Sequence, residues 1–171
     1  MKRIFKMFAV AAMFLSTTAV FGQAKIGHCN TDSLIVLMPE YKTAMETLET
    51  QQAQYESELK QMQTELTQLS QTFEAQKATY SQLRLERDSQ DLQNRYQRMQ
   101  EFAQDAQKRL SEQEQQLLLP VIEKLQEAIN QVAKDKGLDY VLDSSRRNGV
   151  VIFKNDSKDI STAVKTKLGL I

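Results

Sequence analysis

His28 and Cys29 are the residues whose side chains could most readily support catalysis or bind a metal, and they are neighbours in the sequence. The chain has one His and one Cys in total. Adjacent side chains of a strand point to opposite faces, which argues against a Cys–His pair for nucleophilic catalysis. These two ligands alone do not make a zinc site. We interpret Cys29 as a small buried residue near the first strand, with an interchain disulfide as the alternative.

Other chemistry-bearing patterns are missing from the sequence as well. It contains no Gly-rich loop ending in Lys-Ser or Lys-Thr, so nothing indicates ATP binding. The numerous carboxylates lie in a long polar stretch, where such groups usually only solvate a helix surface. We therefore expect a protein that is not an enzyme and that uses no cofactor and no metal.

The first 22 residues have the pattern of a secretory signal peptide. Lys2, Arg3 and Lys6 form a basic start, an apolar stretch runs over residues 7–21, and we place the cleavage after Gly22. The apolar stretch is shorter than a membrane-spanning helix requires, so an uncleaved anchor is the less favoured alternative. The whole chain has 22 basic and 22 acidic residues. Removing the three basic residues of the signal leaves a net charge of −3, and such a chain lacks the basic footprint of a nucleic-acid binder.

The stretch from Tyr41 to Lys136 organises the rest of the chain. Alternating spacings of four and three residues keep one stripe facing a partner helix, as in a coiled coil. The first such stripe consists of Tyr41, Met45, Leu48, Gln52, Tyr55, Leu59, Met62, Leu66, Leu69, Phe73, Gln76, Tyr80 and Leu83. The second consists of Leu92, Tyr96, Met99, Ala103, Ala106, Leu110, Gln113 and Leu117.

Two stripes in succession predict a long antiparallel helical hairpin over residues 39–120. We place its tip between Ala78 and Asp88 and expect the charged segment 84–89 to form a solvated turn. The alternative is one continuous helix that pairs with a second molecule. Pro39 suits the first turn of the outgoing helix, because its missing N–H would be unpaired there anyway. Pro120 removes a hydrogen bond from the returning helix, so we expect a kink there and treat it as a candidate hinge.

Residues 23–38 and 121–171 are expected to form one small α/β body at the base of the hairpin. Its predicted parts are a strand near 25–30, a short capped helix through 34–38, and the end of the returning helix at Gly137. Segments 138–143 and 150–153 are rich in β-branched and aromatic residues and flank Asn148-Gly149, which predicts a β-hairpin. Asp159 or Ser157 can cap a final helix that places Ile160, Ala163, Val164 and Leu168 on one side.

The predicted fold is therefore mostly α, of the α+β type, with a coiled-coil hairpin on a three-stranded body. A sheet and core of this size are marginal alone, so we expect the body to oligomerise. The candidate interface residues are Ile26, Val141, Leu142, Val150, Val151, Ile152 and Phe153.

The order of these parts resembles the Skp/OmpH family of periplasmic chaperones. The resemblance is most specific in Gly137 to Asp143 and in Lys158-Asp159-Ile160, with support from residues 118–122 and 38–41. It implies a periplasmic homotrimer with a small central barrel, whose helical arms enclose a cavity for unfolded outer-membrane proteins. The best-known members are strongly basic, whereas this chain without its signal is slightly acidic.

Two hypotheses of function follow. The first is an ATP-independent holdase that prevents unfolded outer-membrane proteins from aggregating, with Phe102 and Leu85 as candidate client contacts on the free faces of the arms. Its partners would be these clients and further copies of the chain, with transient proximity to a membrane and no nucleic acid. The second hypothesis is a structural or adaptor coiled coil of the cell envelope that binds no unfolded client.

Overall fold

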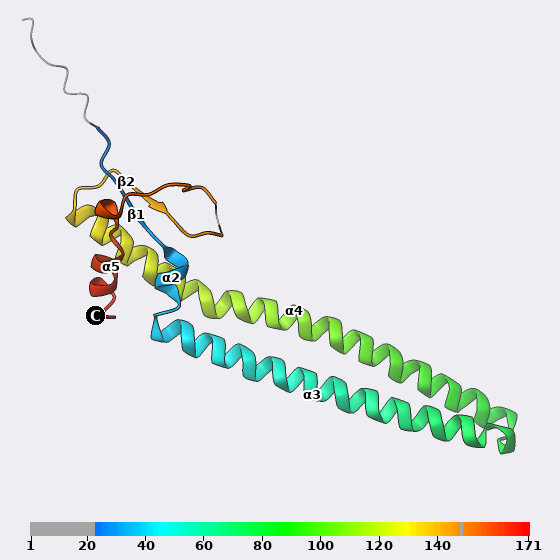
Figure 1. Ribbon diagram of the computed structural model, residues 1–171. Coiled ribbons are helices and arrows are strands. Elements are labelled where there is room, and N and C mark those ends of the chain that lie inside the picture. The colour runs from blue at the N-terminus through cyan, green and yellow to red at the C-terminus, as the bar shows by residue number, and fades with distance from the viewer. Residues whose placement is uncertain (1–22, 148) are drawn as a thin grey trace, which may run out of the picture.

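A long helical hairpin projects from a small body in the computed structural model, which describes residues 23–147 and 149–171 (Figure 1). Helix α3 (Pro39–Gln76) leads away from the body, the 3-10 helix η1 (Lys77–Thr79) lies at the tip, and helix α4 (Gln82–Asp135) returns. With 38 residues, α3 is about 57 Å long. The predicted mostly helical fold and hairpin are confirmed. The predicted signal peptide, residues 1–22, lies outside the described residues.

The tip of the hairpin lies around Ala78, at the N-terminal end of the range predicted from the sequence. Residues 77–79 form η1, Tyr80 is extended, and Ser81 caps α4 by accepting a hydrogen bond from Arg84 N. The segment 84–89, which we expected to be a solvated turn, belongs to the first turns of α4, and this expectation was wrong. The charges favour a helix instead, because Arg84 pairs with Asp88 four residues later on the same face.

The stripes of the two arms agree with the prediction over most of α3 and disagree in part near the body and on α4. On α3 the predicted positions from Tyr55 to Phe73 are half-buried. Nearer the body, the buried residue is Ala44 and not the predicted Met45, which is 41% exposed, and Gln51 rather than Gln52 is half-buried. On α4, Arg95 and Phe102 are half-buried, whereas the predicted Tyr96 and Ala103 are exposed. The helix is therefore rotated by about one residue there, relative to the predicted stripe. Sequence spacing alone could not distinguish these neighbours, since each pair lies beside the same seam.

The sheet of the body has two parallel strands within the described residues, not three. Strand β1 (Ile26–Cys29) pairs with β2 (Tyr140–Asp143), so that Ile26 faces Tyr140 and Cys29 faces Asp143. Parallel strands need a long crossover connection, and the whole helical hairpin provides it. On the other edge of β1, His28 forms a single parallel bridge with Asp159, and Ile160 N donates to His28 O at 2.9 Å.

The predicted β-hairpin between segments 138–143 and 150–153 is therefore wrong. Residues 140–143 do form a strand, but its partner is β1, and residues 150–153 form no strand in this single chain. Residues with high β-propensity need a pleated, half-buried surface to pack on. Here Ile152 and Phe153 find none, and they remain 98% and 87% exposed.

Short helices and caps close the body as expected, with shifted boundaries. Helix α2 (Thr31–Ile35) begins at Asn30, whose side chain accepts from Ser33 N, so it lies about three residues before the predicted span. Helix α4 ends at Asp135, and Gly137 follows its C-cap with a φ of 59°. Gly137 N donates to Lys134 O and Leu138 N to Ala133 O, the hydrogen bonds typical of a glycine that terminates a helix. The 3-10 helix η2 (Asp156–Lys158) precedes α5 (Ser161–Lys167), and Asp159 Oδ1 accepts from Ser161 N at 2.7 Å.

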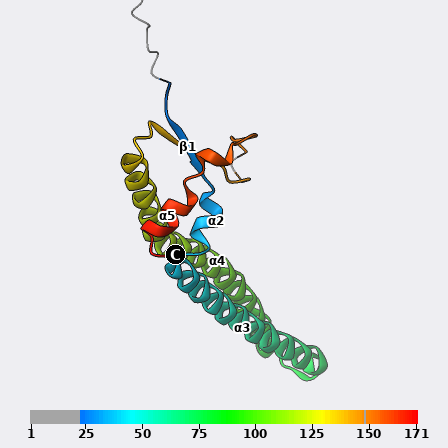
Figure 2. The same ribbon diagram turned by 60° about the vertical axis from the view of Figure 1, so that its left-hand side comes forward.

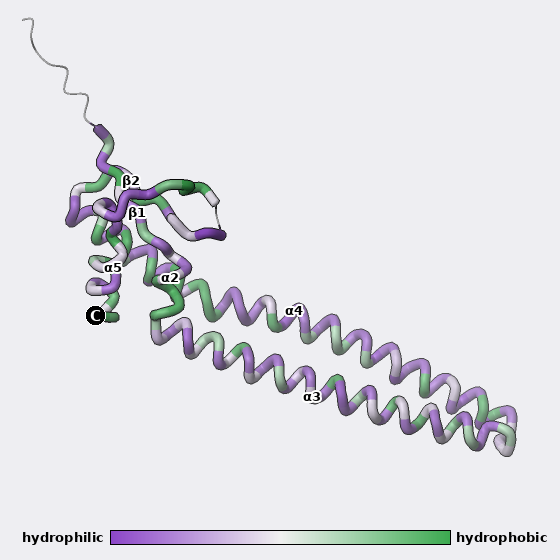
Figure 3. Tube along the Cα trace, viewed as in Figure 1, coloured by the Kyte–Doolittle hydropathy of each residue, from purple (hydrophilic) through white to green (hydrophobic). Residues whose placement is uncertain are grey.

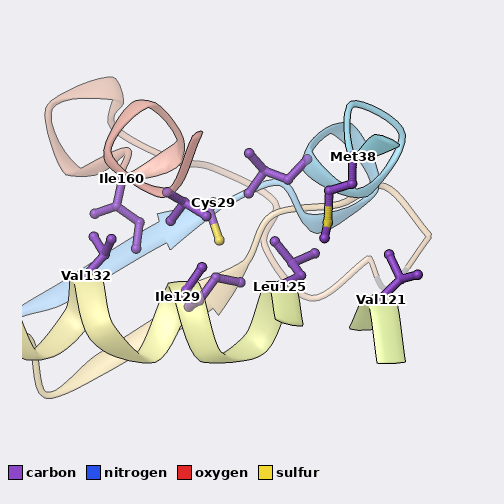
Figure 4. Packing of buried hydrophobic residues seen from close by; sticks show 10 residues of the cluster. Cys29, Met38, Val121, Leu125, Ile129, Val132 and Ile160 are labelled. Carbon is purple, nitrogen blue, oxygen red and sulfur yellow. The ribbon is translucent and has the colours of Figure 1, made fainter. Parts of the chain in front are cut away.

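One hydrophobic core holds these parts of the body together. Its central residues are Cys29, Leu34, Met38, Val121, Leu125, Ala128, Ile129, Val132, Ile160 and Val164. In Figure 4 the side chains of Val132, Ile129, Leu125 and Val121 project from α4 toward β1, α2 and the C-terminal segment. Gly27 packs close beneath this core, since a Cβ there would lie 2.7 Å from Leu138 Cδ1. The other parts of the body therefore pack on about the last four turns of α4.

Candidate functional site

The hairpin contains a groove between its two arms, in the half nearest the body. Its volume is about 510 Å³. Apolar residues from both arms form most of its lining: Met45, Leu48, Tyr55, Leu59, Ala103, Ala106 and Leu110. Polar groups complete it, among them Glu56 on α3 and Glu114 on α4. Concave surfaces with an apolar lining and a few polar groups are typical binding sites.

An aromatic contact between α3 and α4 lies beside this groove. The rings of Tyr55 and Phe102 meet edge to face, with centroids 5.9 Å apart. Further toward the tip, Arg95 of α4 lies 4.0 Å from Glu65 of α3. Phe102, which we predicted as a client contact, is thus half-buried in the seam, and Leu85 near the tip is half-buried too. The role of both residues in client contact stays a prediction.

The base of the hairpin contains a second, more apolar hollow of about 520 Å³. It is lined by Pro39, Thr43, Ala44, Leu117, Pro120 and Val121, together with the ion pair of Glu40 and Lys124. The hydrogen bond from Lys124 lowers the pKa of the Glu40 carboxyl. Helix α4 continues through Pro120 without ending, and its ribbon curves between arm and body (Figures 1 and 2). The hinge at Pro120 stays a prediction.

The outer edge of the small sheet exposes a group of apolar residues. Ile26 and Leu142 are 43% and 41% exposed, Val150 is 73% exposed, and Val141 and Val151 are half-buried. Figure 3 shows hydrophobic colour on the loop that follows β2, away from the core. Ile26, Leu142, Val151 and Phe153 also line a hollow of about 400 Å³. Four of the seven candidate interface residues thus share one hollow, whereas Val141 packs against the core, and the interface itself stays a prediction.

The side chains of His28 and Cys29 are both buried in the body. The Nε2 atom of His28 lies 2.9 Å from Asn155 O, a carbonyl that can only accept, so Nε2 carries the hydrogen. Cys29 is 1% exposed, and burial, followed by the nearby Asp143 and Asp159, raises its pKa to about 11. The thiol is therefore protonated at neutral pH, which is the unreactive form.

Asp143 joins three segments of the body through hydrogen bonds that the sequence did not reveal. Its carboxylate accepts from Thr31 N and Thr31 Oγ1 at 3.3 and 2.7 Å, and from Ser145 N and Ser145 Oγ at 2.9 Å each. Burial alone would raise the pKa of Asp143, but these hydrogen bonds outweigh it and lower the pKa. Ser145 is 3% exposed, so the loop after β2 starts from a fixed point.

Neither a metal cluster nor a membrane-spanning helix is present in the part of the chain that the structure describes. Over residues 23–147 and 149–171, no three His, Cys, Asp or Glu side chains lie together as metal ligands would. Over the same ranges, no helix combines the length and apolar character needed to cross a membrane.

Comparison with known proteins identifies the family of this chain. The model of the family described as outer membrane protein (OmpH-like) matches residues 25–168. The chain belongs to the OmpH-like family. A solved structure from Caulobacter crescentus CB15, described as a candidate outer membrane chaperone (OmpH-like), is similar to this OmpH-like chain with a TM-score of 0.72 and 26% sequence identity. The similarity covers 86% of this chain and 85% of that one. No curated protein gave a sequence match.

Proposed function

We propose that this OmpH-like chain is an ATP-independent holdase chaperone of the periplasm and not an enzyme. Its clients would be unfolded outer-membrane proteins, held between helical arms so that they do not aggregate. The observation that carries the proposal is the architecture itself: long arms with an apolar groove on a small body, in a chain that matches the OmpH-like family over residues 25–168. The similarity to a candidate outer membrane chaperone supports the same reading.

The surface of the arms suits many weak contacts with an unfolded chain. Most apolar side chains of the two stripes pack on the opposite arm and are only partly exposed. The outward faces are rich in Gln, Ser, Thr and charged residues, and the groove adds one apolar hollow between the arms. Several copies of such a surface around one client would add their weak contacts through a high effective concentration. Binding of this kind needs no nucleotide.

Assembly of several chains is the second part of the proposal. A two-stranded sheet is marginal in water. Among the described residues β2 pairs only with β1, so its other edge is unpaired, and Leu142 of β2 lines the same hollow as Val151 and Phe153. Pairing this edge with another copy would cover Leu142, Ile152 and Phe153. A closed homotrimer, as the family resemblance implies, would bring three hairpins around one cavity. The expected signal peptide at 1–22 would place this assembly in the periplasm.

Aggregation of a real client tests the holdase function. The chain from Gln23 onward is mixed at increasing ratios with a urea-unfolded outer-membrane β-barrel, which is diluted into buffer without nucleotide, and light scattering is followed. We expect suppression that saturates near one oligomer per client. If scattering is unchanged at every ratio while circular dichroism shows a folded, helical protein, the holdase proposal fails, and a structural coiled coil of the envelope becomes the better reading.

A further inference from the structure

Acidic charge is concentrated on the half of the arms nearest the body. Residues 39–59 and 102–120 carry eight Asp or Glu and three Lys or Arg, whereas residues 60–101 carry six of each. Near the tip the charges are also largely paired, for example Arg84 with Asp88 and Lys77 with Glu74. The electrostatic field of the arms therefore becomes more negative toward the body.

Ion pairs cancel only part of the acidic charge near the body. Glu40, Asp105 and Glu112 have basic partners. Five carboxylates of the same region have no ion pair among the residues that the structure describes: Glu46, Glu49, Glu56, Glu58 and Glu114. Lys42 is the matching unpaired base in this region of the described chain. The excess negative charge is thus free to attract a ligand.

The apolar groove between the arms lies within this negative region. Two of the unpaired carboxylates line it from opposite sides, Glu56 from α3 and Glu114 from α4, with Gln52, Gln107 and Ser111 as further polar groups. The remaining lining is mainly apolar, with Leu48, Tyr55 and Leu110 among its members. A ligand that fits both features must offer apolar side chains to the lining and positive charge to the two glutamates.

We infer that the groove selects unfolded segments in which apolar residues are interspersed with Lys or Arg, and that Glu56 and Glu114 set this preference. The inference rests on the proposed holdase function and specifies the chemical class of segment that the arms hold. Apolar side chains of the segment occupy the space over Leu48, Tyr55 and Leu110, while its cationic groups reach the two carboxylates. Because both carboxylates are exposed, the preference weakens as salt screens them.

Peptide binding separates this preference from the holdase function. Three fluorescent unfolded peptides share the same Leu, Phe and Val positions and differ only at the interspersed positions, which carry Lys, Ser or Glu. Fluorescence anisotropy with the chain from Gln23 onward gives each affinity at low and high salt. We expect the Lys peptide to bind about fivefold tighter than the Ser peptide at low salt, as weak exposed ion pairs allow, and the difference to shrink at high salt.

Two double variants test the residues. Glu56→Gln with Glu114→Gln should bring the affinity for the Lys peptide to within about twofold of that for the Ser peptide, since the two ion pairs are lost. Glu58→Gln with Glu101→Gln changes the net charge equally at exposed positions outside the groove and should keep the preference. The controls are closely matched, because Glu56 and Glu101 each accept a hydrogen bond from a Gln four residues earlier.

The outcomes distinguish the two proposals. If the Ser peptide binds and client aggregation is suppressed, but the Lys and Ser peptides bind equally, the charge preference is overturned and the holdase function stands. An equal loss of Lys-peptide binding in both double variants also overturns the role of the groove. If none of the three peptides binds and aggregation is not suppressed, both proposals fail.

Discussion

The rings of Tyr55 and Phe102 meet at an interplanar angle of 72° with their centroids 5.9 Å apart, and this contact sets how the two arms face each other. It places Phe102, and not the neighbouring Ala103, in the seam of α4. Edge-to-face aromatic pairs contribute about 0.5–1.5 kcal/mol beyond the area that they bury.

Phe102→Ala should therefore lower the free energy of unfolding by about 1–2 kcal/mol, less than a fully buried Phe would cost because Phe102 is only half-buried. Urea unfolding followed by circular dichroism measures it. Tyr96→Ala is the matched control, because Tyr96 is 50% exposed although the sequence spacing placed it in the seam. A larger loss of stability for Tyr96→Ala would mean that Tyr96 lies in the seam, as the sequence spacing predicted.

Asp143→Asn should destabilise the body at pH 7 by about 1–2 kcal/mol, since a charged acceptor of four hydrogen bonds becomes neutral and one of its oxygens becomes an NH₂ donor. Because the pKa of Asp143 is lowered in the folded chain, its contribution is present above the unfolded pKa and is lost as the pH falls through the folded pKa. The difference from wild type should shrink between pH 7 and pH 3.

Denaturant titrations at several pH values provide the measurement, with Asp156→Asn as control because the Asp156 carboxylate accepts no hydrogen bond among the residues that the structure describes. A destabilisation by Asp143→Asn that stays constant over the whole pH range would contradict an ionised Asp143 at the centre of this network.

Cys29 should react slowly with iodoacetamide in the folded protein. With a pKa of about 11, only about 0.1% of the thiol is thiolate at pH 8, and the side chain is 1% exposed. We expect alkylation at least tenfold slower than in urea, where burial is lost, as measured by mass spectrometry at timed intervals. Equal rates in buffer and in urea would show that Cys29 is accessible.

Ile152→Ser combined with Phe153→Ser should reduce the oligomeric state without unfolding the single chain, since both side chains are almost fully exposed there. Size-exclusion chromatography with light scattering gives the mass. Leu83→Ser is the control, because Leu83 is 78% exposed at the opposite end of the hairpin. An unchanged mass for the double variant would exclude residues 152 and 153 from the interface.

Pro120→Ala should stiffen α4 where the arm meets the body, because it restores the N–H that proline lacks and removes a clash with the preceding turn. If the arms flex there to admit clients, the variant should hold large clients less well than small ones. Aggregation assays with β-barrels of different size measure this range. A range that does not change would show that Pro120 is not the hinge.

Local features of the sequence determined the hairpin and its limits. The stripe from Tyr41 to Phe73 follows from helix periodicity, and Pro39, Ser81 and Gly137 act on hydrogen bonds within about one turn of themselves. Such interactions join residues a few positions apart, so the sequence displays both partners together. The length of the arms, the base of the hairpin and the end of α4 could therefore be predicted.

Only the tertiary structure determined which strands pair and which face of each helix packs on the opposite arm. Segment 140–143 pairs with residues 26–29, more than a hundred positions away, and Asp143 bonds to Thr31 across 112 positions. Segment 150–153 has equal β-propensity but no surface to pack on in one chain. Arg95 rather than Tyr96 faces α3, where it lies 4.0 Å from Glu65, a relation that spacing along α4 does not show. The groove with its two glutamates exists for the same reason: its sides belong to helices that only the folded hairpin brings together.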